Sequence, residues 1–248
     1  MHTLPPPIVE PTPRWVRVKI GGEWVADSRR ALLLIQYGPG RLPTYCFPPE
    51  DVRRDLLGPA APDGELAHHA VAVNGETFEK AAYTFAALPA PLAALQDHIS
   101  FHWDDRTDWY EEDEQVFVHA RDPHKRVDVV ASTRHVEVAI QGVTVADSRR
   151  PRLLFETGLP VRYYLPSEDV RLDLLVPASL KTRCPYKGQA AYWSFKHGDK
   201  FERAIVWYYP QPIPECPKLK DLLCFFNERV DLTVDGVLQP RPQTPWSA

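Results

Sequence analysis

Several features are missing from this 248-residue sequence, and each absence excludes a class of protein. No apolar run approaches the roughly 18 residues of a membrane-spanning helix, and the first residues lack the basic and apolar regions of a signal peptide. The formal net charge of −4 gives no basic field to attract nucleic acid or anionic lipid. None of the four cysteines forms a CxxC pair, so no metal site is predicted. We therefore expect a cytoplasmic protein with free thiols and with neither a membrane nor a nucleic-acid partner.

Proline, by contrast, is abundant. The 26 prolines are about double the usual 5% share. Because proline interrupts helices and marks turns and sheet edges, this content argues against a helical bundle. Hydrophobic residues make up 44% of the chain and charged residues 25%, which is typical of a globular protein with a real core. Five of the prolines fall within residues 1–13, which we expect to form an extended, loosely held tail.

The sequence contains an internal duplication. The string Val-Ala-Asp-Ser-Arg-Arg at residues 25–30 recurs at residues 145–150, and residues 45–53 resemble residues 163–171 in the same order. Six identical residues in a row indicate a tandem repeat of about 120 residues. The predicted organisation is a proline-rich tail over residues 1–13, a first repeat domain over residues 14–128 and a second over residues 129–248.

Hydrophobic residues alternate with a period of two in both repeats, which predicts β-strands. Residues 16–26 and 136–145 each fit a hairpin. A short helix is expected to begin at Ser167, whereas helical spacing over residues 92–99 leaves that stretch ambiguous. The predicted fold is mainly β: two similar antiparallel β domains of a tent-like, small-barrel or sandwich kind, each with one or two short helices.

Residues 182–193 concentrate reactive side chains. This stretch, Thr-Arg-Cys-Pro-Tyr-Lys-Gly-Gln-Ala-Ala-Tyr-Trp, contains a thiol, a primary amine, two phenols and an indole, with a proline and a glycine that bend the backbone. The matching stretch of the first repeat, residues 63–70, has no cysteine, lysine or tryptophan. If the stretch is a site, the first repeat has lost it and serves as a scaffold.

With these motifs, the chain resembles the bacterial family called domain of unknown function 427, in its two-copy form. The resemblance rests on the two Val-Ala-Asp-Ser-Arg-Arg strings, the Cys-Pro-Tyr-Lys-Gly string at residues 184–188 and the Glu-Arg-Val-Asp string at residues 228–231. It implies a compact β fold and little about activity. A nucleotidyltransferase label sometimes attached to the family has no support in these residues, because a glycine-serine phosphate loop followed by an Asp-x-Asp metal pair is absent.

Cys184 and Lys187 are the candidate catalytic residues. Positive charge at Arg183 and Lys187 favours a thiolate at Cys184, which is the nucleophilic form of cysteine. Lys187 suits an anionic ligand, or a Schiff base if its environment lowers its pKa. The plain alternatives are a small buried thiol next to a turn and a lysine in water.

The nearby aromatic residues either line a ligand pocket or belong to the core. Neighbours along a strand point to opposite faces, so Trp193 and Tyr192 mark two different faces. Arg149, in the repeated string, fits either an anion site or a structural ion pair. The expected ligand-binding residues are Arg183, Tyr186, Trp193, Trp207, Tyr164 and Arg149.

Three functions are consistent with these patterns. The first is a binding module for an unidentified small molecule, with an aromatic-lined pocket within residues 163–208 and no cofactor. The second is an enzyme that acts through Cys184 or Lys187. The third is an interaction protein whose exposed strands pair with a strand of a partner. His98 and His102 have the spacing of a helical metal pair, but two histidines alone are weak support for a metal.

Overall fold

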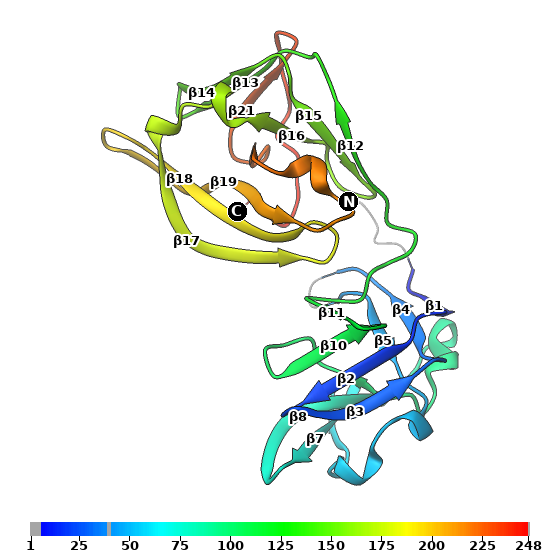
Figure 1. Ribbon diagram of the computed structural model, residues 1–248. Coiled ribbons are helices and arrows are strands. Elements are labelled where there is room, and N and C mark those ends of the chain that lie inside the picture. The colour runs from blue at the N-terminus through cyan, green and yellow to red at the C-terminus, as the bar shows by residue number, and fades with distance from the viewer. Residues whose placement is uncertain (1–5, 39–40, 248) are drawn as a thin grey trace. The chain divides into compact units, whose positions relative to one another are not determined.

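A computed structural model describes residues 6–38 and 41–247 of the chain, which forms two compact units divided between Asp122 and Pro123. Antiparallel strands dominate both units, and the described helices are short 3-10 turns (Figure 1). Within the described residues, no helix has the length and hydrophobicity needed to cross a membrane. The fold is therefore mainly β, as the alternating pattern predicts.

The first unit contains eleven strands and three 3-10 helices among its described residues. The strands are β1 (Ile8–Pro11), β2 (Val16–Ile20), β3 (Glu23–Ser28), β4 (Leu32–Ile35), β5 (Thr44–Cys46), β6 (Ala61–Asp63), β7 (Leu66–Val73), β8 (Glu76–Phe85), β9 (Ser100–Phe101), β10 (Thr107–Glu111) and β11 (Glu114–Val116). The 3-10 helices are η1 (Pro49–Asp51), η2 (Arg54–Leu56) and η3 (Ala90–Leu95).

The second unit repeats this order. Its strands are β12 (Val127–Ala131), β13 (Val136–Ile140), β14 (Val143–Ser148), β15 (Arg152–Glu156), β16 (Arg162–Pro166), β17 (Leu175–Cys184), β18 (Gly188–His197), β19 (Lys200–Pro212), β20 (Leu222–Phe225), β21 (Asp231–Val234) and β22 (Val237–Leu238). Its 3-10 helices are η4 (Ser167–Asp169), η5 (Leu172–Leu174) and η6 (Pro217–Leu219).

Each unit contains a large sheet and a four-stranded sheet. In the second unit the large sheet has seven strands in the order β12-β15-β16-β20-β19-β18-β17, and the small sheet has the order β14-β13-β21-β22. The small sheet of the first unit is β11-β10-β2-β3. Its large sheet is divided into β1-β4-β5 and β6-β7-β8-β9, which meet through backbone hydrogen bonds of 2.7 and 2.9 Å between Phe47 and Ile99.

Cross-strand pairs show which residues of the two units correspond. The matched pairs are Leu34–Thr44 with Leu154–Arg162, Leu32–Cys46 with Arg152–Tyr164, and Tyr83–Ser100 with Trp207–Cys224. Thr44 is therefore the counterpart of Arg162. Gln36 and Glu156 also correspond, because each follows its matched leucine by two positions.

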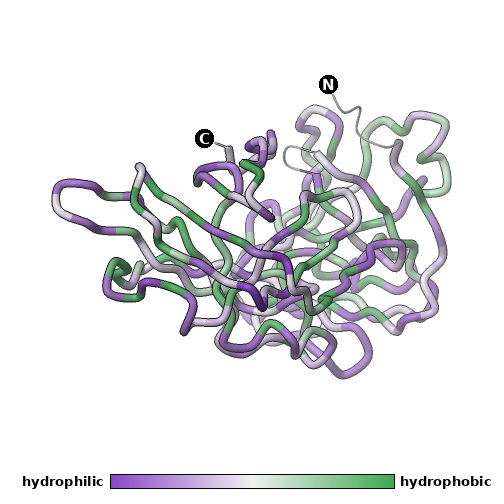
Figure 2. Tube along the Cα trace, turned by 90° about the horizontal axis from the view of Figure 1, so that it is seen from above, coloured by the Kyte–Doolittle hydropathy of each residue, from purple (hydrophilic) through white to green (hydrophobic). Residues whose placement is uncertain are grey.

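The main core of each unit involves residues of both its sheets. Alternate residues of β2 and of β13 are buried there, as expected for strands with one face on a core. Trp109, Tyr45 and Phe47 are the largest of these side chains in the first unit, and Phe195 and Leu165 are prominent in the second. Hydrophobic and hydrophilic residues are interspersed along the whole trace (Figure 2).

Two expectations from the sequence need correction. Residues 8–11 are not a loose tail, because β1 pairs with β4 over all four of its residues; residues 1–5 lie outside the described part of the chain. The helix expected from Ser167 is instead two 3-10 turns, η4 and η5, and Ser167 makes no side-chain cap. β16 ends at Pro166 and β17 begins at Leu175, so the short connection between them holds only these two turns. The ambiguous stretch over residues 92–99 contains part of η3.

The repeated Val-Ala-Asp-Ser-Arg-Arg string has a structural role in both units. Ser148 Oγ donates to Asp169 at 2.7 Å, and the Arg150 guanidinium donates to the same carboxylate at 2.9 and 3.1 Å. Ser28 and Arg30 bind Asp51 with the same three distances. Each string therefore clamps the end of a strand, β3 or β14, to a 3-10 helix, η1 or η4. This shared role explains why both copies keep the string.

Candidate functional site

One face of the seven-stranded sheet, here called the polar face, collects charged and aromatic side chains. Residues paired across antiparallel strands point to the same side of a sheet. The pairing of β15, β16, β20 and β19 therefore places on one side Leu154, Glu156, Arg162, Tyr164, Trp207, Tyr209 and Cys224. The opposite side of these strands packs into the main core.

The turn between β17 and β18 brings Lys187 to this face. The Lys187 N–H donates to the Cys184 carbonyl at 3.3 Å, and the Lys187 carbonyl accepts from the Ile213 N–H at 3.1 Å. Gly188 has φ of +105°, and a Cβ there would lie 3.1 Å from the carbonyl oxygen of Gln211. Glycine is needed at this position because the turn closes directly against β19. The Cys-Pro-Tyr-Lys-Gly string is thus the sequence of a tight, packed turn.

Lys187 is a buried cation paired with a buried carboxylate. Its ammonium donates to Glu156, and Lys125 Nζ lies 3.5 Å from the other oxygen of that carboxylate. Burial is the largest influence on the pKa of Lys187 and lowers it, but the charges of Cys184 and Glu156 outweigh burial and raise this pKa above 10.5. Lys187 therefore stays protonated at neutral pH, which opposes Schiff-base chemistry.

Two thiols share the surroundings of Lys187. Cys184 is half-buried, whereas Cys216 is buried, and burial raises the pKa of Cys216. Both thiols act on the pKa of Lys187, so the thiols and the amine belong to one cluster. A hollow of about 270 Å³ lies beside Cys216, lined by residues 127–130 of β12 and residues 215–218 around η6. No aromatic ring lines this hollow, and Tyr164, Trp207 and Tyr209 of the polar face are buried.

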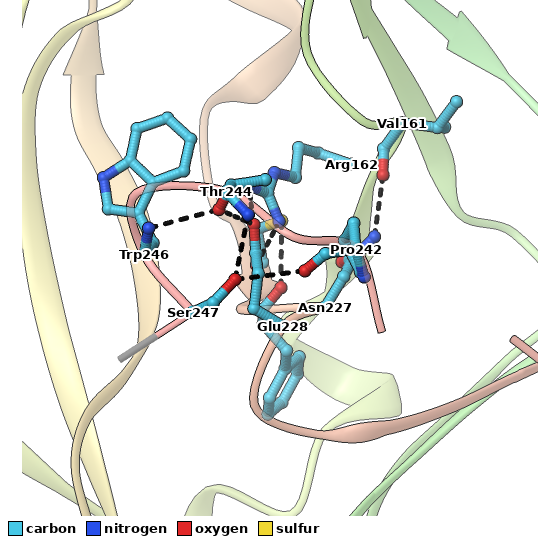
Figure 3. Close-up of polar contacts among 10 residues, drawn as sticks. Val161, Arg162, Asn227, Glu228, Pro242, Thr244, Trp246 and Ser247 are labelled. Atoms are coloured by element: carbon cyan, nitrogen blue, oxygen red, sulfur yellow. Dashed lines mark hydrogen bonds and ion pairs between the residues drawn. The ribbon is translucent and has the colours of Figure 1, made fainter. Parts of the chain in front are cut away.

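A second buried ion pair, Arg162 with Glu228, lies on the polar face. The guanidinium donates to both carboxylate oxygens at 2.7 Å, and the two side chains are 8% and 0% exposed. Thr244 Oγ1 also donates to Glu228, at 2.6 Å. Figure 3 shows Thr244, Trp246 and Ser247 gathered at this ion pair. Bidentate pairing fixes the orientation of the guanidinium.

The aromatic residues at the centre of the polar face are held by a specific contact. Trp207 Nε1 donates to the Tyr164 hydroxyl at 2.9 Å, and the Arg162 guanidinium carbon lies 5.4 Å from the centroid of the Trp207 ring. Burial raises the pKa of Tyr164 well above its ordinary value, with a further contribution from Cys224. Tyr164 is therefore a neutral hydroxyl at physiological pH.

The other predicted residues of the 182–193 stretch are dispersed. Arg183 is exposed on β17. Tyr186 is half-buried, with Lys125 Nζ 5.7 Å from the centroid of its ring. Trp193 lies on the opposite side of the sheet, packed against the main core with its ring centroid 6.2 Å from that of Tyr208. Trp193 therefore cannot share a pocket with Trp207 across the sheet.

Arg149 belongs to a contact in the small sheet. Its Nη2 lies 3.4 Å from His135 Nδ1, and His135 Nε2 lies 2.7 Å from an Asp147 oxygen. In the first unit, the Trp15 indole donates to Asp27 at the same distance of 2.7 Å. Because a tryptophan and a histidine make the same bond at matched positions, the bond is a shared structural feature.

The same histidine belongs to the one group of three metal-type ligands found in the described part of the chain. Ligand atoms of His135, Glu137 and Asp147 lie within 4.8 Å of one another. The structural bond described above accounts for the closest contact within this group. His98 and His102 do not meet: His98 is half-buried and hydrogen-bonded to the Gln96 carbonyl, and His102 stacks on a histidine of β7.

The matching face of the first unit has neutral side chains where the second has buried charges. Thr44 replaces Arg162 and Gln36 replaces Glu156. Part of this face is a small apolar cluster, made by Leu34, Cys46, Leu92 and Leu95. Beside it, Tyr83 and His102 form a ring pair 4.8 Å apart, in the place of Trp207 and Phe226. The charged pairs are therefore specific to the second unit.

Sequence reasoning missed Glu156, Arg162 and Glu228. A signal was available: once the repeats are aligned through their shared strings, a neutral residue becomes charged at inward-facing strand positions 156 and 162. Such a change in one copy of a duplicated fold marks residues whose charges the fold itself does not require. Glu228 carried no such signal, because its partner is 66 residues away.

Comparison with known proteins assigns the chain to a family. Among curated proteins, none matches the chain. The family model described as Domain of unknown function (DUF427) matches residues 8–113 and, separately, residues 128–236. These two matches coincide with the two β units and cover most of the sequence. The chain therefore belongs to the DUF427 family, with two copies of the domain in tandem.

Proposed function

We propose that the second unit is a small-molecule-binding module and that its ligand contacts the polar face. The observation that carries the proposal is the replacement of Gln36 and Thr44 by Glu156 and Arg162 at matched positions. Buried ion pairs often stabilise a fold no better than well-packed apolar residues. The first unit builds the same sheet without these charges, so the fold does not need them.

The hollow beside Cys216 supports the proposal, because a ligand could enter the second unit there. It adjoins the cluster of Cys184, Lys187 and Glu156 and has a volume of about 270 Å³, which suits a small ligand or part of a larger one. The protonated Lys187 supplies a positive charge in this cluster. A ligand with a polar group directed at Lys187 and an apolar body against Val127 and Val129 fits this arrangement.

A thermal-shift screen of metabolites on the full chain tests the proposal. The double variant Glu156→Gln/Lys187→Met removes both charges of this ion pair together, so neither partner is left as an unpaired buried ion. We expect at least one compound to raise the melting temperature of the natural chain, and the double variant to bind it at least tenfold more weakly. Gln36→Ala in the first unit is the matched control and should leave binding unchanged. Compounds that bind the double variant equally well, or a screen without a compound that binds, would contradict the proposal.

The proximity of Cys184 and Lys187 favours a second candidate, covalent chemistry at the half-buried thiol. The raised pKa of Lys187 keeps a positive charge near Cys184, which is accessible enough to meet a substrate. Turnover of an electrophilic substrate that is lost in Cys184→Ser and kept in Cys216→Ser would support this function. Equal activity of both variants would exclude it.

A further inference from the structure

The segment after β22, residues 239–247, lies against the Arg162–Glu228 ion pair (Figure 3). Thr244 Oγ1 donates to Glu228 at 2.6 Å. The ring centroid of Trp246 lies 5.5 Å from the guanidinium carbon of Arg162, a distance typical of a cation–π contact. The segment thus supplies a flat aromatic ring to the guanidinium and a hydrogen-bond donor to the carboxylate.

This segment is anchored at its start, where the Gln239 N–H donates to the Leu232 carbonyl and Arg241 Nη2 donates to Asp231, both at 2.8 Å, but the rest has few buried contacts. None of residues 239–247 is buried, and Trp246 is 43% exposed although it is a large apolar side chain. Arg162 and Glu228, beneath it, are almost wholly inaccessible. Segments with few buried contacts open at low free-energy cost, because little apolar surface is lost to water.

The segment also has a shape of its own. The Thr244 N–H donates to Ser247 Oγ at 2.9 Å, and the Ser247 N–H donates back to the Thr244 carbonyl at 3.1 Å. Ser247 Oγ donates in turn to the Pro242 carbonyl at 3.1 Å. Because these bonds are internal, the turn can leave the ion pair without first unfolding.

The first unit closes the matching position in a different way. Trp103 Nε1 donates to Thr44 Oγ1 at 2.9 Å, and the Trp103 ring stacks on the buried Trp109 at 4.2 Å with an interplanar angle of 3°. Trp103 comes two residues after β9, and the residue two positions after β20 is Asn227. The second unit therefore lacks this fixed tryptophan and has Trp246 on the outer segment instead.

We propose that residues 239–247 form a detachable strap over the Arg162 end of the polar face, and that a flat aromatic ligand with a donor group binds there when the strap lifts. Its ring takes the place of the Trp246 indole over Arg162, and its hydroxyl or amino group takes the place of Thr244 on Glu228. This inference rests on the proposed function and names its ligand class. The strap competes with the ligand, so its release regulates binding.

Calorimetry on three chains tests the strap: the natural chain, a chain truncated after Leu238, and the full-length Thr244→Val/Trp246→Ala variant. The probes are adenine, a flat ring with an amino group, and a synthetic peptide of residues 239–247. We expect both variants to bind each probe at least tenfold more tightly than the natural chain does. The truncated chain with Arg162→Met/Glu228→Gln should lose this gain. Should truncation unfold the second unit, the full-length double variant decides the outcome.

Each outcome separates the strap from the proposed function. Equal affinities for adenine in the natural and strap-altered chains would overturn the strap and leave small-molecule binding standing. Rebinding of the peptide without any adenine binding would support the strap as a cover and contradict the ligand class. If neither probe binds the strap-altered chains, and hydrogen exchange at residues 226–230 is the same in all three chains, the strap is overturned.

Discussion

The two units have nearly the same backbone, but the polar face of the second unit and the matching face of the first have different side chains. In the first, neutral and apolar side chains fill the face, and the fixed Trp103 closes it at Thr44. In the second, two buried ion pairs and a hydrogen-bonded Tyr164–Trp207 pair occupy it. The clamp made by the repeated string is the same in both. The comparison teaches that the frame of this fold and the chemistry of its large sheet are set by separate residues.

The largest expected difference comes from removing one member of a buried ion pair. Arg162→Ala leaves the Glu228 carboxylate buried without its partner, so the free energy of unfolding of the second unit should fall by about 3–5 kcal/mol. Thr44→Ala, the matched change in the first unit, removes only neutral hydrogen bonds and should cost about 1–2 kcal/mol. Urea denaturation combined with hydrogen exchange in β16 and β5 measures both. Equal losses in the two units would break the comparison.

The next difference concerns thiol reactivity. Cys184 is half-buried beside a cation, whereas burial raises the pKa of Cys46 in the first unit to about 12. Iodoacetamide near neutral pH should therefore modify Cys184 at least tenfold faster than Cys46, as followed by mass spectrometry. Lys187→Met should slow Cys184 without changing Cys46. Uniformly slow modification of both would remove the case for a reactive thiol in the second unit.

A third prediction uses alkaline pH. The pKa of Lys187 is raised in the folded state, so its contribution to stability is complete below its unfolded pKa near 10.5 and is lost as pH rises through the folded pKa. Glu156→Gln/Lys187→Met should reduce the loss of stability of the second unit above about pH 10.5. The alkaline loss of the first unit, where burial raises the pKa of Tyr83 to about 12, should stay unchanged. Thermal melts from pH 8 to pH 12 test the difference between the units.

The smallest expected effect is one that the units share. The hydrogen bond from Arg30 is the largest influence on the pKa of Asp51 and lowers it, and Arg150 does the same for Asp169. Carboxylates with a lowered pKa stabilise the fold above their unfolded pKa, and this stabilisation is lost as pH falls through the folded value. Asp51→Asn and Asp169→Asn should therefore cause equal and small losses at pH 7 that disappear toward pH 3. Unequal losses, measured by hydrogen exchange in each unit, would show that the clamps differ.

Much of the frame could be predicted from the sequence. Period-two alternation predicts the hairpins, and a six-residue string repeated at a constant offset predicts two units. The strand β1 could not be predicted, because its proline-rich sequence has no alternation and its partner β4 lies more than twenty residues later. The 3-10 turns depended on tertiary packing rather than on the local capping pattern around Ser167.

The site was predictable only in part. The turn containing Cys184 and Lys187 could be found because its reactive residues are consecutive in sequence. Its ion partner Glu156, 31 positions away, is not evident from the local sequence, and only the alignment of the two repeats could have pointed to it. Trp193 and Trp207 were predicted to belong to one ligand site, because both are aromatic residues on neighbouring strands. The register instead places them on opposite sides of the sheet. The ligand-site predictions for Arg183, Tyr186 and Arg149 stay predictions.

The clamp at Ser148, Arg150 and Asp169 has a consequence for protein engineering. It lies at the rim of the domain and is duplicated at Ser28, Arg30 and Asp51 with the same bond lengths. In an engineered variant, the clamp residues can therefore be kept while the buried side chains of either unit are redesigned. The natural chain already has two different sets of such side chains on two copies of one fold.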